Sequence, residues 1–302
     1  MGSPLMTEQA FEQLRGVLRD NEMLSRHTSW RVGGPAKWFY QPADIDDLSC
    51  FLQQLATETE LYWVGLGSNL LVRDKGFDGA LICTSGVLNG IEVLDDDRIY
   101  VEAGVACPKA AKTAAKQGLA SAEFLCGIPG TMGGALAMNA GAFGGETWDI
   151  VESVETINRQ GQRQVRTPEE FDIDYRHVAG KDGEWFVSCV LRLKQGDAKA
   201  SLAQIKQLLN KRGATQPTQQ PNAGSVFRNP ANDYAARLIE SCGLKGMCIG
   251  GACVSDKHAN FIVNTGTASA SDIELLINKV RQAVKSETGI VLQPEVKIVG
   301  EH

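Results

Sequence analysis

The segment Gly-Ile-Pro-Gly-Thr-Met-Gly-Gly-Ala-Leu-Ala-Met-Asn-Ala-Gly-Ala-Phe-Gly-Gly occupies residues 127–145 of a chain of 302 residues. Seven of these nineteen residues are glycine, and none carries a charge. Such a composition suits neither a packed core nor a solvated loop. It does allow backbone to lie directly against a flat ligand and its diphosphate. A glycine-rich loop that packs two domains together is the alternative interpretation.

A shorter glycine-rich stretch, Gly-Leu-Gly-Ser-Asn at residues 65–69, stands at the end of the apolar run 61–66. Backbone N–H groups in such a turn can bind an anion, and Ser68 and Asn69 add side-chain donors. The pattern differs from a dinucleotide-binding fingerprint because Leu70 stands where the last glycine would be, and no Gly-Lys-Ser/Thr follows as in a Walker loop. Taken alone, the stretch could also be an ordinary strand followed by a turn.

The composition is that of a globular protein, with 43% hydrophobic and 22% charged residues and a net charge of −6. The acidic balance argues against a nucleic-acid partner. No apolar run approaches the roughly 18 residues of a membrane helix, so no membrane association is expected, and no secretory signal is evident. The eight cysteines form no Cys-x-x-Cys pair and no zinc-like spacing with histidine, which predicts reduced, mostly buried thiols and no metal site.

Apolar periodicity predicts a mixture of helices and strands, an α+β fold. Helices are predicted over about the first 25 residues and at residues 44–56, 109–117, 201–211, 234–241 and 272–288. Strands are predicted at residues 61–66, 99–104, 151–157, 185–193, 261–263 and 296–299. Ser271 and Asp272 are candidates for the N-cap region of the last helix.

Three consecutive domains are predicted. The sequence texture changes after about residue 85, where short strand-like runs begin to alternate with turns. A polar connection punctuated by prolines covers residues 216–222 and marks the start of a third unit. The predicted domains are residues 1–85, which include the N-terminal helix, residues 86–212 and residues 213–302.

Further motifs accompany the two glycine-rich stretches in a fixed order. They are Asp-Tyr-Arg at 174–176, Asn-Ala-Gly-Ser-Val-Phe-Arg-Asn-Pro at 222–230, Leu-Lys-Gly at 244–246, Ser-Asp-Lys-His-Ala-Asn-Phe at 255–261 and Gln-Pro-Glu-Val at 293–296. Together they resemble the UDP-N-acetylenolpyruvoylglucosamine reductases, a family in the PCMH class of flavoproteins, and the likeness covers nearly the whole chain from about Asn21. It implies a PCMH-type FAD-binding module of two subdomains, followed by an α+β substrate-binding domain. The absence of an obvious insertion in the third domain resembles the type II branch of the family, which lacks a substrate-binding tyrosine loop.

The resemblance implies an enzyme, UDP-N-acetylmuramate dehydrogenase, that reduces UDP-N-acetylglucosamine enolpyruvate to UDP-N-acetylmuramate in peptidoglycan precursor synthesis. FAD would be held non-covalently, NADPH would donate the hydride, and the protein would be a cytoplasmic monomer. Hydride addition to the enolpyruvyl alkene requires stabilisation of the charge that develops toward the carboxylate, and then a proton for the other alkene carbon. By resemblance, Arg176 and Glu295 serve the first need and Ser225 the second.

The resemblance also implies two sets of binding residues. The expected FAD-binding residues are Gly65, Leu66, Gly67, Ser68, Asn69, Gly127, Ile128, Pro129, Gly130, Thr131, Gly133, Gly134, Asn139, Ala140 and Gly141. The expected substrate-binding residues are Tyr175, Arg212, Arg228, Asn229, Lys245 and His258. Two alternatives stay open: another PCMH-type flavin oxidase or dehydrogenase, which differs in whether NADPH bleaches its flavin, and a non-catalytic binder of nucleotide sugars.

Overall fold

The computed structural model describes residues 13–301, which form two compact units. Among these residues, unit 1 contains residues 13–20, 38–65 and 79–201, and unit 2 contains residues 21–37, 66–78 and 202–301. The compact units therefore do not follow the three consecutive segments suggested by sequence. The division into two FAD-binding subdomains and a substrate-binding domain concerns ligands and stays a prediction.

The first sheet has the strand order β1-β2-β5-β3. Its strands are β1 (Val17–Met23), β2 (Pro35–Gln41), β5 (Phe77–Cys83) and β3 (Glu60–Val64), and β3 runs parallel to β5. Helix α1 (Ile45–Gln54) begins where Asp44 accepts a hydrogen bond of 2.8 Å from the backbone N–H of Asp47. Phe51 of this helix stacks on Tyr40, with ring centroids 4.1 Å apart, in a core that joins helix and sheet.

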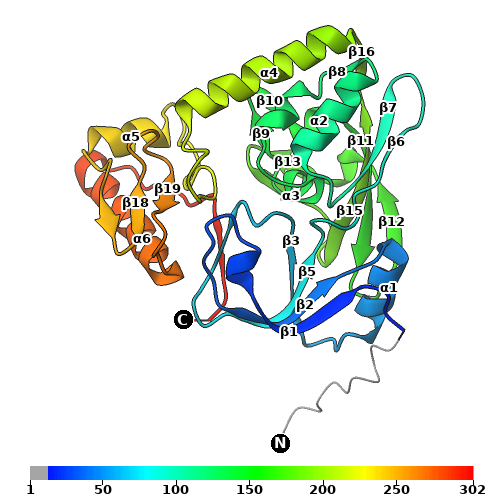
Figure 1. Cartoon of the computed structure of the whole chain (residues 1–302), viewed down its shortest axis with the longest axis horizontal. Helices are drawn as coiled ribbons and strands as arrows, with labels where there is room; N and C mark the ends of the chain where they lie inside the picture. The colour runs from blue at the N-terminus through cyan, green and yellow to red at the C-terminus, as the bar shows by residue number, and fades with distance from the viewer. Residues whose placement is uncertain (1–12, 302) are drawn as a thin grey trace, which may run out of the picture. The chain divides into compact units, whose positions relative to one another are not determined.

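A second sheet lies wholly in unit 1; it is antiparallel, with the order β12-β11-β15-β7-β6 (Figure 1). Its strands are β12 (Arg163–Arg166), β11 (Val151–Asn158), β15 (Glu184–Arg192), β7 (Arg98–Glu102) and β6 (Ile91–Val93). Helix α3 (Met132–Ala137), which lies within the long glycine-rich segment, packs against β15 and β7. The other elements of unit 1 are α2 (Cys107–Lys116), β8 (Leu119–Ala120), η3 (Glu123–Gly127), β9 (Gly141–Ala142), β10 (Gly145–Glu146), η4 (Thr147–Ile150), η5 (Pro168–Glu170), β13 (Asp172–Asp174), β14 (His177–Ala179) and β16 (Lys194–Gln195).

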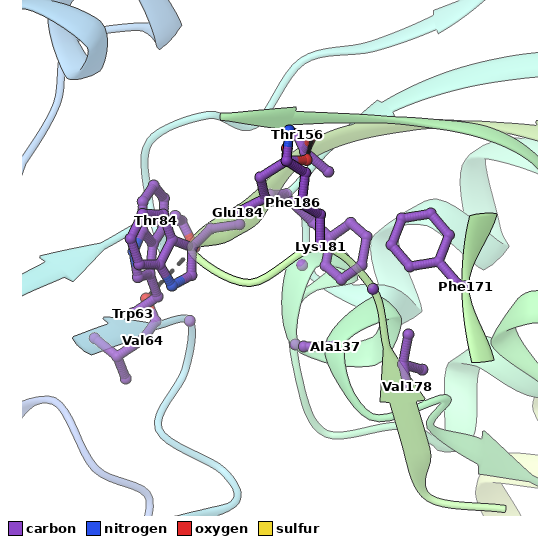
Figure 2. Close-up of a pocket in the computed structure, with 16 residues that line it drawn as sticks. Trp63, Val64, Thr84, Ala137, Thr156, Phe171, Val178, Lys181, Glu184 and Phe186 are labelled. Atoms are coloured by element: carbon purple, nitrogen blue, oxygen red, sulfur yellow. Dashed lines mark hydrogen bonds and ion pairs between the residues drawn. The ribbon is translucent and has the colours of Figure 1, made fainter. Parts of the chain in front are cut away.

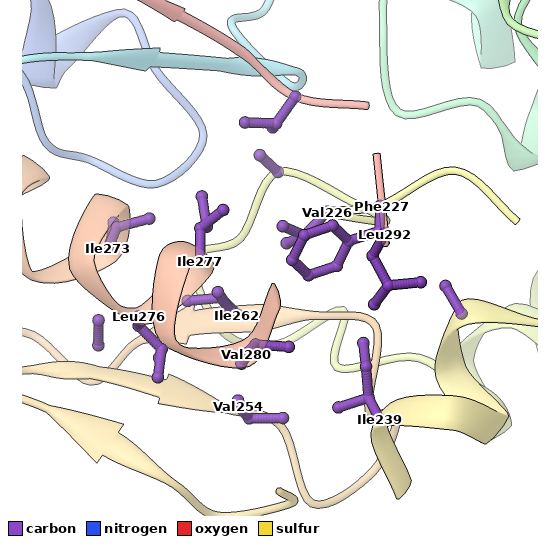
Figure 3. Packing of buried hydrophobic residues seen from close by; sticks show 14 of the residues in the cluster. Val226, Phe227, Ile239, Val254, Ile262, Ile273, Leu276, Ile277, Val280 and Leu292 are labelled. Carbon is purple, nitrogen blue, oxygen red and sulfur yellow. The ribbon is translucent and has the colours of Figure 1, made fainter. Parts of the chain in front are cut away.

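Unit 2 packs its helices on a small sheet. Its elements are η2 (Leu24–Arg26), β4 (Leu70–Val72), α5 (Ala235–Ser241), β17 (Cys248–Ile249), β18 (Ala252–Val254), β19 (Ile262–Asn264), α6 (Ala270–Thr288) and β20 (Lys297–Val299). Helix α4 (Ala198–Thr215) begins in unit 1 and ends in unit 2. One face of α6 buries Ile273, Leu276 and Val280, and Figure 3 shows these side chains directed at the sheet and at the segment that carries Phe227.

An early part of the chain completes this core. Trp30 is fully buried in it, and its indole N–H donates a hydrogen bond of 2.8 Å to the backbone carbonyl of Ile262. The amide of Asn264 donates in return to the Trp30 carbonyl at 2.9 Å. Burial of a tryptophan is worth about 3–5 kcal/mol, so residues 21–37 join unit 2 although they lie more than 180 residues from most of it in sequence.

Most predicted elements are confirmed. The helices predicted at 44–56, 109–117, 201–211, 234–241 and 272–288 correspond to α1, α2, α4, α5 and α6, and the six predicted strands correspond to β3, β7, β11, β15, β19 and β20. The predicted α+β fold is therefore present. Among the described residues, no helix combines the length and the apolar character needed to cross a membrane.

The predicted N-terminal helix is wrong over the residues that the structure describes. Residues 13–16 are not helical and β1 follows them, while residues 1–12 lie outside the described part. Leu14 and Leu18 nevertheless pack against the core of unit 1. A four-residue step returns a side chain to the same face in a strand as well as in a helix, so the spacing could not distinguish the two.

Two further expectations need correction. The N-cap of α6 is Ser269, not Ser271; its hydroxyl accepts the backbone N–H of Asp272, and the carboxylate of Asp272 accepts the N–H of Ser269, both at 3.0 Å. The cysteines are not all reduced, because Cys248 and Cys253 form a disulfide. These two residues face each other across the antiparallel pair β17–β18, a relation that a spacing of five residues does not reveal.

Candidate functional site

A cavity of about 270 Å³ lies in unit 1. Both glycine-rich segments contribute to its wall, through Gly65 from the first and Gly133 and Gly134 from the second. Aromatic side chains form much of the rest, among them Phe171 and Phe186, and Figure 2 shows these two rings on the same side of the cavity. Glycine backbone and aromatic rings together form a space suited to a flat ligand group.

One wall of the cavity carries an ion-paired carboxylate, that of Glu184, with the ammonium group of Lys181 at 3.7 Å. The carboxylate of Glu184, only 6% exposed, accepts hydrogen bonds from two guanidinium N–H groups of Arg166, at 2.7 and 2.8 Å, and from the Thr156 hydroxyl at 2.7 Å. The Arg166 hydrogen bonds lower the pKa of Glu184 to about 2, so Glu184 is ionised at neutral pH. Arg166 and Lys181 offset this charge, so Glu184 does not make the cavity negative. An ionised carboxylate can accept hydrogen bonds from ring N–H or ribose hydroxyl groups.

The residues between the two glycine-rich segments fit a bound cofactor. A Cβ atom on Gly65 would lie 2.2 Å from the hydroxyl oxygen of Thr131, so only glycine allows this approach. The Thr131 hydroxyl and the Trp63 indole N–H are both buried and have no hydrogen-bond partner among the described residues. Buried polar groups are normally hydrogen-bonded, so a polar group of a bound ligand is suited to pair with these two.

The end of the long glycine-rich segment holds Arg176 of the β13–β14 hairpin. The Arg176 guanidinium donates hydrogen bonds of 3.0 Å to the backbone carbonyls of Asn139 and Gly141. It also lies over the ring of Tyr175, with Cζ 4.8 Å from the ring centroid. Asn139 and Arg176 both have positive φ angles, 43° and 54°. Such backbone strain in non-glycine residues often clusters at functional sites.

Unit 2 brings Ser225 and Glu295 together. Val226, which follows Ser225, accepts the backbone N–H of Glu295 at 2.8 Å, and the neighbouring Phe227 pairs with Pro294. The amide side chain of Asn69, from the first glycine-rich segment, donates to the backbone carbonyl of Glu295 at 3.2 Å. Three motifs separated by up to 226 residues thus meet at one place, where the Ser225 and Glu295 side chains are both partly buried.

The predicted substrate-binding residues of unit 2 show mixed surroundings. Lys245 forms an ion pair of 2.7 Å with Glu240, and the pKa of His258 is lowered by burial and by the charge of Lys245, which favours a neutral imidazole. The Asn229 side-chain oxygen accepts the N–H of Ala235 at the start of α5. Arg212 donates to the side chain of Gln216.

Arg228 is a further candidate with an open requirement. Its Nε–H is buried and lacks a hydrogen-bond partner among residues 13–301. The backbone on either side of it is fixed, because its own N–H donates to the Gln293 carbonyl at 2.9 Å. A buried guanidinium donor in this position is suited to an anionic ligand group.

The structure thus separates the predicted site residues into three groups. Gly65, Gly133 and Gly134 line the cavity of unit 1, and Arg176 is fixed to Asn139 and Gly141 in the same unit. In unit 2, the backbone N–H of Glu295 is hydrogen-bonded to Val226, the residue after Ser225. The other predicted FAD-binding residues are not part of the cavity wall.

Several cavity residues escaped sequence reasoning. Trp185 and Phe186 lie in a run that reads only as a half-buried strand, and Glu184 precedes it as an ordinary charged residue. Phe171 sits in an irregular segment with no motif. The only signal available was the neighbouring pair of large aromatic residues at the start of β15, which is equally typical of a core.

Comparison with known proteins gives two family matches. A model described as an FAD binding domain matches residues 36–166, and one described as UDP-N-acetylenolpyruvoylglucosamine reductase, C-terminal domain, matches residues 216–299. A protein named UDP-N-acetylenolpyruvoylglucosamine reductase from Methylococcus capsulatus is 58% identical over 287 residues, covering 95% of this chain and 94% of that protein. One of the same name from Nitrosococcus oceani is 56% identical over 288 residues, covering 95% and 97%.

A solved structure extends this likeness to three dimensions. The crystal structure of UDP-N-acetylenolpyruvylglucosamine reductase from Thermus caldophilus matches with a TM-score of 0.78 and 33% sequence identity. The match covers 94% of this chain and 99% of that one. Both the sequence and the fold are therefore similar over almost the entire length.

Proposed function

The chain belongs to the UDP-N-acetylenolpyruvoylglucosamine reductase family, and we propose which of its residues carry out the family reaction. It is the enzyme that reduces UDP-N-acetylglucosamine enolpyruvate to UDP-N-acetylmuramate, in peptidoglycan precursor synthesis, at the expense of NADPH. FAD, when bound, supplies the hydride-transfer chemistry. The other roles in the reaction belong to the protein's own side chains.

The cavity of unit 1 receives the adenosine end of FAD. Its volume of about 270 Å³ is smaller than the roughly 300–1,000 Å³ of whole ligand pockets, so it accommodates only part of the cofactor. The aromatic lining, which includes Phe171 and Phe186, favours the flat adenine ring over the diphosphate. The carboxylate of Glu184 can accept hydrogen bonds from the adenine amino group or the ribose. Thr131 and the glycine backbone beside it face the diphosphate instead, because an uncharged loop rich in N–H donors suits an anion.

Arg176, Ser225 and Glu295 act on the reacting part of the substrate. The Arg176 guanidinium stabilises the charge that develops toward the substrate carboxylate as the alkene is reduced, and Glu295 shares this task as a hydrogen-bonding partner. Ser225 gives a proton to the alkene carbon that becomes electron-rich. The pairing of Val226 with Glu295, held by Asn69, is the observation that supports this assignment most directly, because it makes Ser225 and Glu295 neighbours.

The remaining polar residues bind the UDP-sugar. Lys245 and Arg228 supply positive charge to the diphosphate, with Arg212 as a further cation. Asn229 and the neutral His258 supply hydrogen bonds, and Tyr175 contributes from the hairpin that carries Arg176. Residues 1–85 and 86–212 form the FAD-binding part and residues 213–302 the substrate-binding part. The protein works as a cytoplasmic monomer without nucleic-acid or membrane partners.

Replacement of Ser225 by alanine tests the catalytic assignment. The variant should bind FAD and let NADPH bleach the flavin at close to the wild-type rate, because neither step needs the hydroxyl. Reoxidation by the enolpyruvyl UDP-sugar should slow by about 10²–10⁴-fold, the usual contribution of a general acid. Stopped-flow absorbance separates the two half-reactions.

Two controls sharpen the result. Ser225→Cys should retain more activity than Ser225→Ala, because a thiol can still donate a proton. Ser241→Ala removes a hydroxyl from an exposed serine of α5 and should change neither half-reaction. Normal reoxidation by Ser225→Ala would show that Ser225 is not the proton donor, and loss of flavin would show that its role is structural.

A further inference from the structure

Glu146 lies at the centre of the contacts that hold Arg176, although none of the roles proposed for the reaction involves it. One of its carboxylate oxygens is 3.7 Å from Nη1 of Arg176. The other accepts a hydrogen bond of 2.8 Å from the side-chain amide of Asn139. Asn139 is the residue whose backbone carbonyl accepts a hydrogen bond from the same Nη1 atom. Glu146 therefore acts on the guanidinium both directly and through Asn139.

The carboxylate of Glu146 is itself held in place. Glu146 precedes the short helix η4, where its side chain accepts the backbone N–H of Asp149 and its own N–H donates to the Asp149 carboxylate at 3.0 Å. Its side chain is 34% exposed, whereas that of Arg176 is only 15% exposed. A carboxylate with a fixed backbone and two side-chain partners presents its charge from one defined direction.

The side chain of Asn139 uses all the groups that it offers here. Besides Glu146, its amide N–H₂ donates to the backbone carbonyl of Asp174 at 3.3 Å, and its oxygen accepts the N–H of Trp148 at 3.2 Å. Asp174 lies in β13, two residues before Arg176. Asn139 thus fastens the long glycine-rich segment to the hairpin that carries Arg176, and Glu146 fixes the orientation of the Asn139 amide.

The distances distinguish two kinds of contact on the guanidinium. The carbonyls of Asn139 and Gly141 lie at hydrogen-bond distance, 3.0 Å, and set the plane of the guanidinium. Glu146 at 3.7 Å is beyond a good hydrogen bond, so it attracts Nη1 as a charge and does not compete for the hydrogen-bond geometry. This combination orients Arg176 without a bidentate ion pair that would neutralise it at short range.

We propose that Glu146 is a positioning residue that orients Arg176 for the stabilisation of developing charge on the substrate. This inference rests on the proposed role of Arg176. It requires that loss of Glu146 impairs the substrate half-reaction and spares the reduction of the flavin by NADPH. It also requires that the effect disappears when Arg176 is absent, because Glu146 acts only through that side chain.

The test compares five variants in the two half-reactions. Glu146→Gln keeps the size of the side chain and an acceptor for Asn139 but removes the charge, and it should slow reoxidation by the enolpyruvyl UDP-sugar by about 10-fold. Glu146→Ala should slow it by about 100-fold, near the lower end of the loss seen when one charge-stabilising donor is removed. In both variants kcat and kcat/KM should fall together, as expected for an interaction made in the transition state. Glu152→Gln is the matched control: Glu152 of β11 has a side chain of similar exposure, 27%, and its ion pairs are with Arg98 and Arg192, so its loss of charge should leave reoxidation unchanged.

The variant Arg176→Ala separates the proposed role of Arg176 from the positioning role of Glu146. Normal reoxidation in Arg176→Ala would overturn the proposed role of Arg176 itself. Slow reoxidation in Arg176→Ala with wild-type rates in both Glu146 variants would overturn the positioning role alone. A double variant Glu146→Ala, Arg176→Ala that is as slow as Arg176→Ala supports the inference. A double variant that is a further 100-fold slower, or a loss in Glu152→Gln equal to that in Glu146→Gln, contradicts it.

Discussion

Replacement of Gly134 by alanine places a methyl group in the cavity of unit 1 with little disturbance of the protein. Gly134 lies in α3, and a Cβ atom there would meet only the Thr131 hydroxyl, at 3.9 Å, an ordinary contact distance. Alanine is favoured over glycine in a helix interior by about 1 kcal/mol. The apoprotein should therefore be as stable as the wild type or slightly more stable.

The same methyl group should weaken FAD binding. If the cofactor fills the cavity, the added atom occupies space that the ligand needs, and an excess methyl group in a packed space costs about 1–3 kcal/mol. Since about 1.4 kcal/mol is a tenfold change in Kd, the Kd for FAD should rise by roughly 5- to 150-fold. The assay is titration of apoprotein with FAD, followed by flavin fluorescence, together with thermal unfolding of the apoprotein.

Two other glycines provide the comparison. Gly213 of α4 also has open space around it, so Gly213→Ala should show the gain in stability and an unchanged Kd for FAD. Gly65→Ala should destabilise the apoprotein itself, because its Cβ would lie 2.2 Å from the Thr131 hydroxyl oxygen. Wild-type affinity for FAD in Gly134→Ala would refute the placement of the cofactor in this cavity.

The remaining predictions concern stability. Glu184→Gln should lower the free energy of unfolding by about 2 kcal/mol at pH 7, because the charged Glu184 is hydrogen-bonded to Arg166. Because folding lowers the pKa of Glu184 from 4.5 to about 2, its contribution to stability is present above pH 4.5 and lost as the pH falls toward 2. The difference in free energy of unfolding between variant and wild type, measured with denaturant, should shrink over this range. A difference that stays constant would contradict the prediction. Because Cys248 and Cys253 form a disulfide, protein denatured without reductant should contain six titratable thiols from its eight cysteines, and a count of eight would show that the pair is reduced. Cys248→Ser should lower the free energy of unfolding by about 2 kcal/mol.

Regular elements with a strong local signal were predictable from the sequence. Helix α6 has an apolar face at the required spacing, which is a local property, although its N-cap is Ser269 and not the predicted Ser271. The N-terminal helix was wrong because residues 14 and 18 fit either period, and the outcome depends on pairing with β2, which the spacing of apolar residues does not record. Residues 21–37 belong to unit 2 because Trp30 is buried there, a tertiary interaction that no local sequence pattern records.

The candidate site shows the same division. The composition of the two glycine-rich segments predicted contact with a ligand, and Gly65, Gly133 and Gly134 of these segments line the cavity. Their contact with FAD stays a prediction. The neighbourhood of Ser225 and Glu295 comes from backbone pairing between segments some 70 residues apart, which only the fold reveals. Glu146 and Glu184 look like ordinary charged residues in the sequence, and their roles come from the partners that surround them in space.

The most direct test of the account follows flavin absorbance through both half-reactions in one anaerobic experiment. Purified protein reconstituted with FAD should be bleached by NADPH, and addition of UDP-N-acetylglucosamine enolpyruvate should restore the oxidised spectrum with formation of one UDP-N-acetylmuramate for each flavin reoxidised. A flavin that NADPH bleaches but the enolpyruvyl UDP-sugar does not reoxidise, or a protein that cannot be reconstituted with FAD, would contradict the proposed function.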